Sequence, residues 1–173
     1  MSEQEILEQE VQETEETEEK VQGAGADSTL RNHVLGALGV GMIPIPIVDI
    51  VALTGIQLNL LRKLAAEYDV PFSEDLVRNI LGSLIGGSVP VLFSRTFFSL
   101  LKGIPLIGHT AGALTMPILA GATTYAVGKV FIQHFASGGT FLTFDPDKVR
   151  EFYNEMYKEG QEMASNLDKK KKV

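Results

Sequence analysis

Three histidines are the side chains of this 173-residue chain best suited to acid–base or metal chemistry near neutral pH. His33, His109 and His134 stand far apart, and none has another histidine or an acid at a helical metal-ligand spacing. Cysteine is absent, which excludes disulfides, thiolate catalysis and cysteine-ligated zinc. The chain also carries no G-x-x-x-x-G-K-[ST] motif for nucleotide phosphates. The sequence therefore predicts a non-enzymatic protein with no cofactor and no bound metal.

Two ionisable residues remain as candidates for a polar function. His109 lies inside residues 103–128, which carry no formal charge when this histidine is neutral. An ionisable residue in such a segment is a functional candidate, although a loop or helix-start position explains it equally well. Asp49 falls in the first turn of a predicted helix, where interaction with the helix dipole is the favoured interpretation. An ion-binding role for Asp49 is the alternative.

Charge is distributed unevenly along the chain. Residues 1–26 hold nine glutamates and one lysine, whereas the net charge of the whole chain is only −7. The body is therefore nearly neutral, which argues against a nucleic-acid partner. Because the N-terminal segment has little apolar surface to bury, residues 1–27 are predicted to be a disordered acidic tail. The alternative is a short segment that folds on a partner.

The body, residues 28–164, is predicted to be all-α. Residues 103–128 are 26 consecutive residues without a formal charge, and about 20 suffice to cross a bilayer. We therefore expect a small membrane-associated helical bundle built on an apolar hairpin over residues 76–135. Apolar spacing and capping residues predict the helices at 47–68, 76–101, 104–135 and 146–164. Pro46 can serve as the first helical residue of the first of these, and the glycines at 138–139 can provide the left-handed C-cap that stops the third.

Small residues recur at helix-packing spacing in both arms of the predicted hairpin. Each arm holds one G-x-x-x-G pair, which lets a second helix approach closely. We interpret the four glycines as the packing faces of the hairpin; a glycine-rich soluble core is the alternative. They are Gly82 and Gly86 in the first arm, and Gly108 and Gly112 in the second.

The C-terminal residues 165–173 form a basic tail. Its four consecutive lysines predict attraction to anionic lipid head groups, with a solubilising tail as the alternative. The distribution of positive charge around the apolar arms favours a two-crossing hairpin with both termini in the cytoplasm. The lysines are Lys169, Lys170, Lys171 and Lys172.

The segment from Ile43 to Asp49 reads Ile-Pro-Ile-Pro-Ile-Val-Asp and opens a helix with Gln57 near its middle. Gln57 is a further candidate for a functional polar residue. With further matches in order, the chain resembles the YcjF-like bacterial family, a domain of unknown function, over roughly residues 28–160. That resemblance implies association with the bacterial inner membrane and with small GTPases, and it brings no catalytic residues. Because this chain has no GTPase domain of its own, a GTPase would be a separate partner. The further matches are 105–108, 122–128 and 134–139.

These patterns support three hypotheses. The first is a membrane-associated scaffold or anchor that binds membrane lipid and forms a homo-oligomer, with the acidic tail contacting a GTPase. The second is a small channel or transporter, because broken apolar helices together with Asp49 and His109 resemble such sites. The third is a soluble helical assembly that buries its apolar segments between subunits.

Overall fold

A computed structural model describes residues 3–41, 46–92 and 110–171 of the chain. No strand occurs within these ranges, so the predicted all-α fold is confirmed. The helices are α1 (Glu3–Val40), α2 (Pro46–Glu67), α3 (Glu74–Leu92), α5 (Thr110–Ala136) and α6 (Arg150–Lys171).

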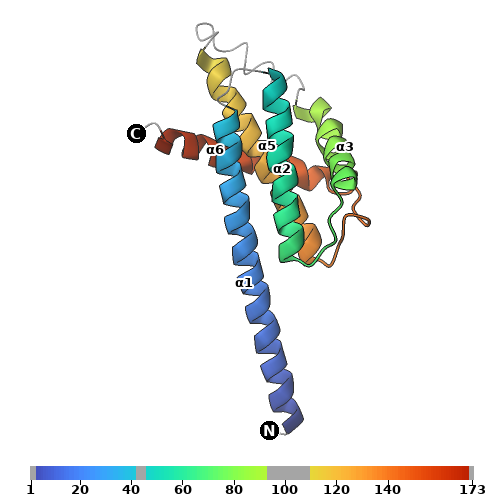
Figure 1. The fold of residues 1–173 in the computed structure, drawn as a ribbon. Coiled ribbons are helices and arrows are strands. Elements are labelled where there is room, and N and C mark those ends of the chain that lie inside the picture. Colours follow the sequence, from blue (N-terminus) through green and yellow to red (C-terminus); the bar gives the residue numbers. More distant parts are fainter. Residues whose placement is uncertain (1–2, 42–45, 93–109, 172–173) are drawn as a thin grey trace.

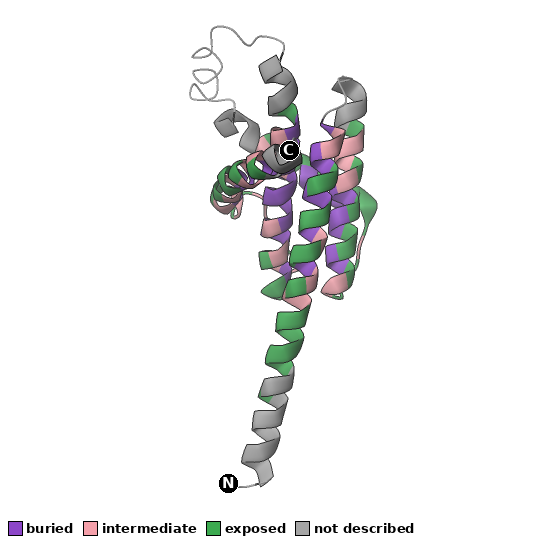
Figure 2. Ribbon diagram, turned by 90° about the vertical axis from the view of Figure 1, so that its left-hand side faces the viewer, coloured by how far each residue is buried: buried purple, intermediate pink, exposed green. Residues whose placement is uncertain are grey.

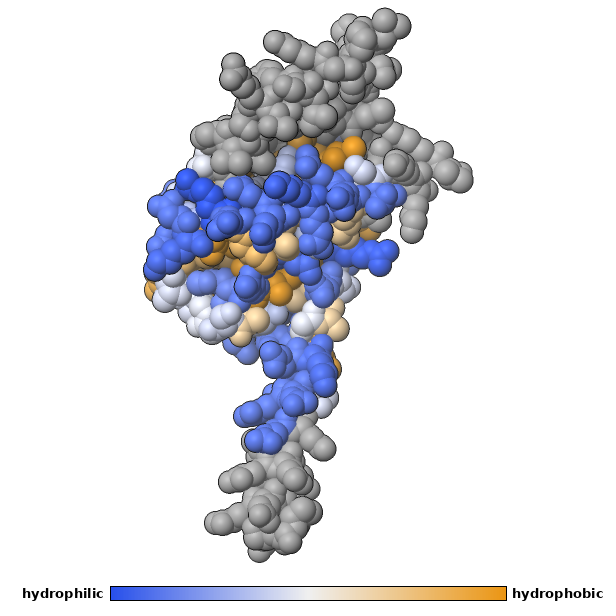
Figure 3. Space-filling model, turned by 180° about the vertical axis from the view of Figure 1, so that it is seen from behind, coloured by the Kyte–Doolittle hydropathy of each residue, from blue (hydrophilic) through white to orange (hydrophobic). Residues whose placement is uncertain are grey.

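The helices α1, α2 and α5 stand side by side, and α6 lies across them (Figure 1). α1 runs antiparallel to both α2 and α5, while α3 lies on the far side of α2. The buried residues of α1, α2 and α5 face one another in the centre (Figure 2). The rear of the bundle, where α6 crosses, is largely hydrophilic with small hydrophobic areas (Figure 3).

Local chemistry sets several of the helix ends. α2 begins at Pro46, as predicted, because the missing N–H of proline costs nothing at a first helical position. α3 begins just after Ser73, whose carbonyl accepts a hydrogen bond from the Val77 N–H at 3.0 Å. α5 stops before Gly138, which adopts a left-handed φ of 78° that favours glycine. The last helix begins at Arg150 rather than at residue 146, and a turn fills the difference.

The prediction of a disordered tail over residues 1–27 is wrong, because α1 starts at Glu3. Its C-terminal half carries an apolar stripe that begins before the predicted boundary: Ala26 and Val34 are fully buried and Leu30 almost so. The acidic half is rich in residues with high helix propensity, so it continues the helix as an exposed arm. Residues 15–20 on this arm are all exposed, and the arm projects away from the bundle (Figure 2).

The predicted hairpin packing of Gly82 and Gly86 against the second arm is also wrong. α3 packs against α2 and α6, whereas α5 packs mainly against α6 and α1. Both glycines are exposed, and a Cβ at either would meet no atom within 4 Å. Within the described ranges no helix combines the length and apolarity that a membrane crossing needs. Residues 93–109, between the two arms, lie outside the described residues.

Other glycines bring the helices together. A Cβ at Gly128 of α5 would lie 2.2 Å from Leu30 Cδ1 of α1. A Cβ at Gly160 of α6 would lie 3.0 Å from both the Cα and the carbonyl oxygen of Ala122 on α5. Glycine-mediated helix packing therefore occurs, but at positions that the G-x-x-x-G spacing did not identify.

Buried tyrosines make the interface between α5 and α6 sensitive to alkali. The Tyr125 hydroxyl donates a 2.6 Å hydrogen bond to Glu159 Oε1. Burial, and then this hydrogen bond, raise the pKa of Tyr125 above its ordinary value. Burial raises the pKa of Tyr153 as well, and it raises the pKa of Tyr157 from 10.0 to about 12. The folded state therefore keeps these phenols protonated at a pH where the unfolded chain has ionised them.

We expect the free energy of unfolding to fall as the pH rises from 10 towards 12. The stabilisation is complete below the unfolded pKa of 10.0 and is lost as the pH passes through the folded value of about 12. Urea unfolding across this range checks it. Lysines lose charge in the same range, so the diagnostic comparison is with Tyr157→Phe. That variant should lose stability less steeply, and an unchanged slope would contradict the assignment.

Candidate functional site

A cleft between α2 and α3 is the best candidate for a functional site. It encloses about 390 Å³, within the range of about 300–1,000 Å³ that ligand pockets occupy. A second cleft of about 320 Å³ continues along the same two helices, and Arg78 lines both. The first cleft is lined by Thr54 and Gln57 of α2 and by Arg78, Leu81, Gly82, Ile85 and Gly86 of α3.

Glycine opens the α3 wall of this cleft. Gly82 and Gly86 lie one helical turn apart, so both are on the same side of α3. Because no atom lies within 4 Å of where either Cβ would stand, the space beside them is unfilled. Leu81 is 3% exposed and belongs to the core, while Ile85 packs partly buried against it. The wall is therefore apolar and accessible to a chain-like group.

Gln57 is the buried polar side chain of the cleft. It is only 2% exposed, and its amide nitrogen has no hydrogen-bond partner. A buried donor without a partner costs about 1–3 kcal/mol of stability. The structure thus brings Gln57, a predicted polar candidate, together with Gly82 and Gly86 of the predicted packing face.

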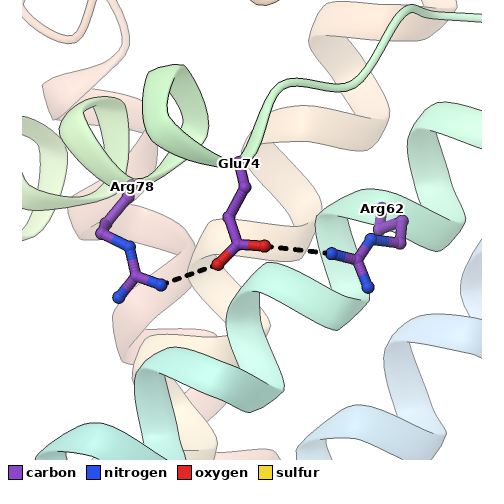
Figure 4. Close-up of polar contacts among 3 residues, drawn as sticks. All are labelled: Arg62, Glu74 and Arg78. Atoms are coloured by element: carbon purple, nitrogen blue, oxygen red, sulfur yellow. Dashed lines mark hydrogen bonds and ion pairs between the residues drawn. The ribbon is translucent and has the colours of Figure 1, made fainter.

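An ion triad fixes the charged rim of the cleft (Figure 4). Glu74 lies between two arginines: its Oε1 is 2.8 Å from Arg78 Nη2, and its Oε2 is 3.3 Å from Arg62 Nη2. The Arg62 guanidinium also lies 5.0 Å from the centre of the Phe72 ring. These side chains are about half exposed, so each pair contributes at most about 1 kcal/mol. The arrangement holds the Arg78 guanidinium beside the cleft.

This triad was not predicted from the sequence. The spacing of Glu74 and Arg78, four residues apart at the start of a helix, was a signal that could have found half of it. The contact with Arg62 depends on how the connector between α2 and α3 returns the chain, which has no comparable sequence signal.

The interface of α1 and α2 holds a separate polar network around His33. Its Nδ1 lies 2.7 Å from the carbonyl oxygen of Thr29, so this nitrogen carries the proton and donates. Its Nε2 then accepts from the Asn59 amide at 3.1 Å. Thr29 in turn donates to Glu67 Oε1 at 2.6 Å. The network ties the two helices together, and His33 has a structural role in it.

His134 also has a structural role. Its Nε2 lies 2.9 Å from the carbonyl oxygen of Thr140, so it donates across the turn that ends α5. In the part of the chain that the structure describes, no three histidine, aspartate or glutamate side chains are placed to hold a metal ion.

The remaining candidates cannot be compared with the structure at the side-chain level. Asp49 lies in the first turn of α2 and Gly112 in the first turn of α5, but their surroundings fall outside the described side chains. Gly108 and His109 fall outside the described residues altogether. Lys169, Lys170 and Lys171 lie in the last turn of α6, and Lys172 comes after the last described residue. Their predicted roles stay predictions.

The described residues thus form an all-α bundle with an open cleft between α2 and α3. The model of one family, "Domain of unknown function (DUF697)", matches residues 3–162. The chain therefore belongs to this family, as its resemblance to the YcjF-like proteins implied. It is also 35% identical over 149 residues to "Magnetosome membrane protein 22" of Magnetospirillum gryphiswaldense. That alignment covers 86% of this chain and 76% of the relative. No solved structure matches.

Proposed function

We propose that this protein is a non-enzymatic, membrane-associated helical module that binds a membrane with one end of its bundle. The observation that carries the proposal is a separation of surface character along the bundle. Exposed apolar side chains gather at one end, and the acidic arm of α1 projects from the other. The name of the relative, a magnetosome membrane protein, supports the same class of function.

The apolar end is where α1 finishes and where α2 and α5 begin (Figure 1). Within two helical turns of this end lie Leu35, Val51 and Met116, which are 42%, 69% and 50% exposed. Exposed apolar residues that gather in one region indicate a protein or membrane contact. The described part of α3 ends and α5 begins at this end as well (Figure 1), and the sequence between them, residues 93–109, includes three phenylalanines.

The acidic arm is the element best suited to meet a partner. Its exposed residues 15–20 carry four glutamates and one lysine. An anionic surface repels anionic lipid, so the arm would point away from the bilayer and remain available to other proteins. We propose that the module scaffolds or anchors such a partner, a separate GTPase being the one its family implies. In this arrangement it forms a homo-oligomer on the bacterial inner membrane, with both termini in the cytoplasm.

Vesicle flotation at neutral pH tests the membrane proposal. We expect the full chain to float with vesicles that contain anionic phospholipid. The double variant Val51→Glu/Met116→Glu should partition at least about tenfold less, because burying one such side chain contributes about 1.5–3 kcal/mol. Neutral pH is needed because strongly alkaline extraction would ionise the tyrosines between α5 and α6.

The matched control is Val21→Glu/Leu142→Glu. These two residues are also apolar and exposed, at 68% and 85%, but lie away from the apolar end. This variant should float like the unmodified chain. If neither the unmodified chain nor the control variant floats, and both elute in the absence of detergent as one large particle, the membrane proposal fails. The soluble assembly is then favoured. Equal loss of flotation in both variants would show that this end is not the contact surface.

A further inference from the structure

We propose that the cleft between α2 and α3 is a binding site for a fatty carboxylate, an unbranched acyl chain that ends in a carboxylate group. The inference goes beyond the proposed membrane association and does not depend on it, because it rests on the lining of the cleft alone. The ligand would fill the open space beside Gly82 and Gly86 and would give the unpaired amide nitrogen of Gln57 a hydrogen-bond acceptor.

The head group is specified by the hydrogen-bonding character of the lining. Gln57 supplies a buried amide nitrogen that lacks an acceptor, and Arg78 supplies a guanidinium. The cleft that contains Gln57 has no aspartate or glutamate in its lining. A guanidinium has five N–H donors, and Glu74 is the acceptor of one of its nitrogens. Two donors in one lining, together carrying one positive charge, match a monoanionic acceptor. Carboxylate is the group that arginine binds with favourable geometry.

The chain is specified by the rest of the lining. Leu81 and Ile85 provide apolar contact, while the missing side chains of Gly82 and Gly86 leave an open path along α3. An unbranched acyl chain is narrow enough to follow such a path. The volume of about 390 Å³ is near the lower end of the range for ligand pockets, which indicates a chain of medium length.

Titration of the isotope-labelled full chain with decanoate tests this assignment. Nuclear magnetic resonance of side-chain amides reports on Gln57 directly, and no vesicles are present. We expect decanoate to shift the Gln57 amide and to bind at least about tenfold more tightly than decanol, a difference of about 1.4 kcal/mol. Decyl phosphate should bind more weakly than decanoate, because the cleft holds a single cation.

Two variants separate binding from folding. Gln57→Leu removes the unpaired buried donor, so it should fold at least as stably as the unmodified chain while losing about tenfold in affinity. Gly82→Leu fills the cleft from an exposed helical position and should abolish binding. Its matched control is Gly36→Leu, at another exposed helical glycine with no atom within 4 Å of its Cβ position, which should bind normally.

Several results would overturn the assignment. Decanol binding as tightly as decanoate would remove the carboxylate from the proposal, and tighter binding of decyl phosphate would replace it with phosphate. Unchanged binding by Gly82→Leu would place the ligand elsewhere. If the chain stays in solution only with lipid present, a photoreactive analogue of decanoate provides the same test. Crosslinks competed by decanoate should then map to the peptides that contain Gln57 or Leu81.

Discussion

Replacing Phe131 by alanine is expected to lower the free energy of unfolding by about 3–5 kcal/mol. Phe131 is fully buried in α5, and its ring is surrounded by other aromatic rings. It stacks on Phe144 with centroids 4.5 Å apart, and it lies 5.5 Å from both Phe135 and Phe141. Alanine would remove all of these contacts and leave a cavity that the surrounding helix and turn cannot close.

The size of this loss makes it measurable by simple means. Domains are stabilised by about 5–15 kcal/mol in total, so the variant would lose a large share of that. Thermal unfolding should occur roughly 6–20 °C lower, on the scale expected for a chain of this size. Leu142→Ala is the control from the same turn, because Leu142 is 85% exposed and should change stability little. Equal effects of the two substitutions would mean that the aromatic cluster is not a core.

The features that the sequence predicted well are those fixed by local chemistry. The start of α2 at Pro46 and the stop of α5 before Gly138 each result from the backbone properties of one residue. The all-α fold results from helical spacing over long segments. None of these predictions requires knowledge of which helices are neighbours.

The acidic tail was predicted wrongly because its composition was considered apart from the rest of α1. The acidic segment buries little by itself, but residues 3–26 begin a helix whose later residues Leu30 and Val34 pack in the core. Once α1 is anchored there, extending it costs no new nucleation, and glutamate favours the helix. Helix formation in this arm is a consequence of tertiary packing further along the chain.

The candidate site could be predicted only in pieces. Gln57, Gly82 and Gly86 were identified, but the glycine spacing was interpreted as a helix-packing face. Spacing places two glycines on one side of a helix without saying what that side meets. The adjacency of α2 and α3 and the position of Arg78 come from the tertiary fold, and they turn the same glycines into the wall of a cleft.

The second large effect is expected from Gly160→Leu, which should displace α6 from the bundle. The Cβ alone would stand 3.0 Å from two backbone atoms of Ala122 and from the Cβ of Tyr125. Backbone atoms in the centre of α5 cannot move aside as a flexible side chain can. Overpacking of this kind costs about 1–3 kcal/mol, and the remaining atoms of leucine add to it. The adjacent hydrogen bond from Tyr125 to Glu159 should be lost as well.

Gly36→Leu provides a control of opposite sign. Gly36 is exposed in α1 with no atom within 4 Å of its Cβ position, so leucine there relieves the poor helix propensity of glycine. It should raise the free energy of unfolding by about 0.5–1 kcal/mol, while Gly160→Leu lowers it. Urea unfolding measures both changes, and hydrogen exchange localises the second: amides of α6 should lose protection while those of α2 retain it. If α6 stays protected in Gly160→Leu, the contact with Ala122 is looser than the structure has it.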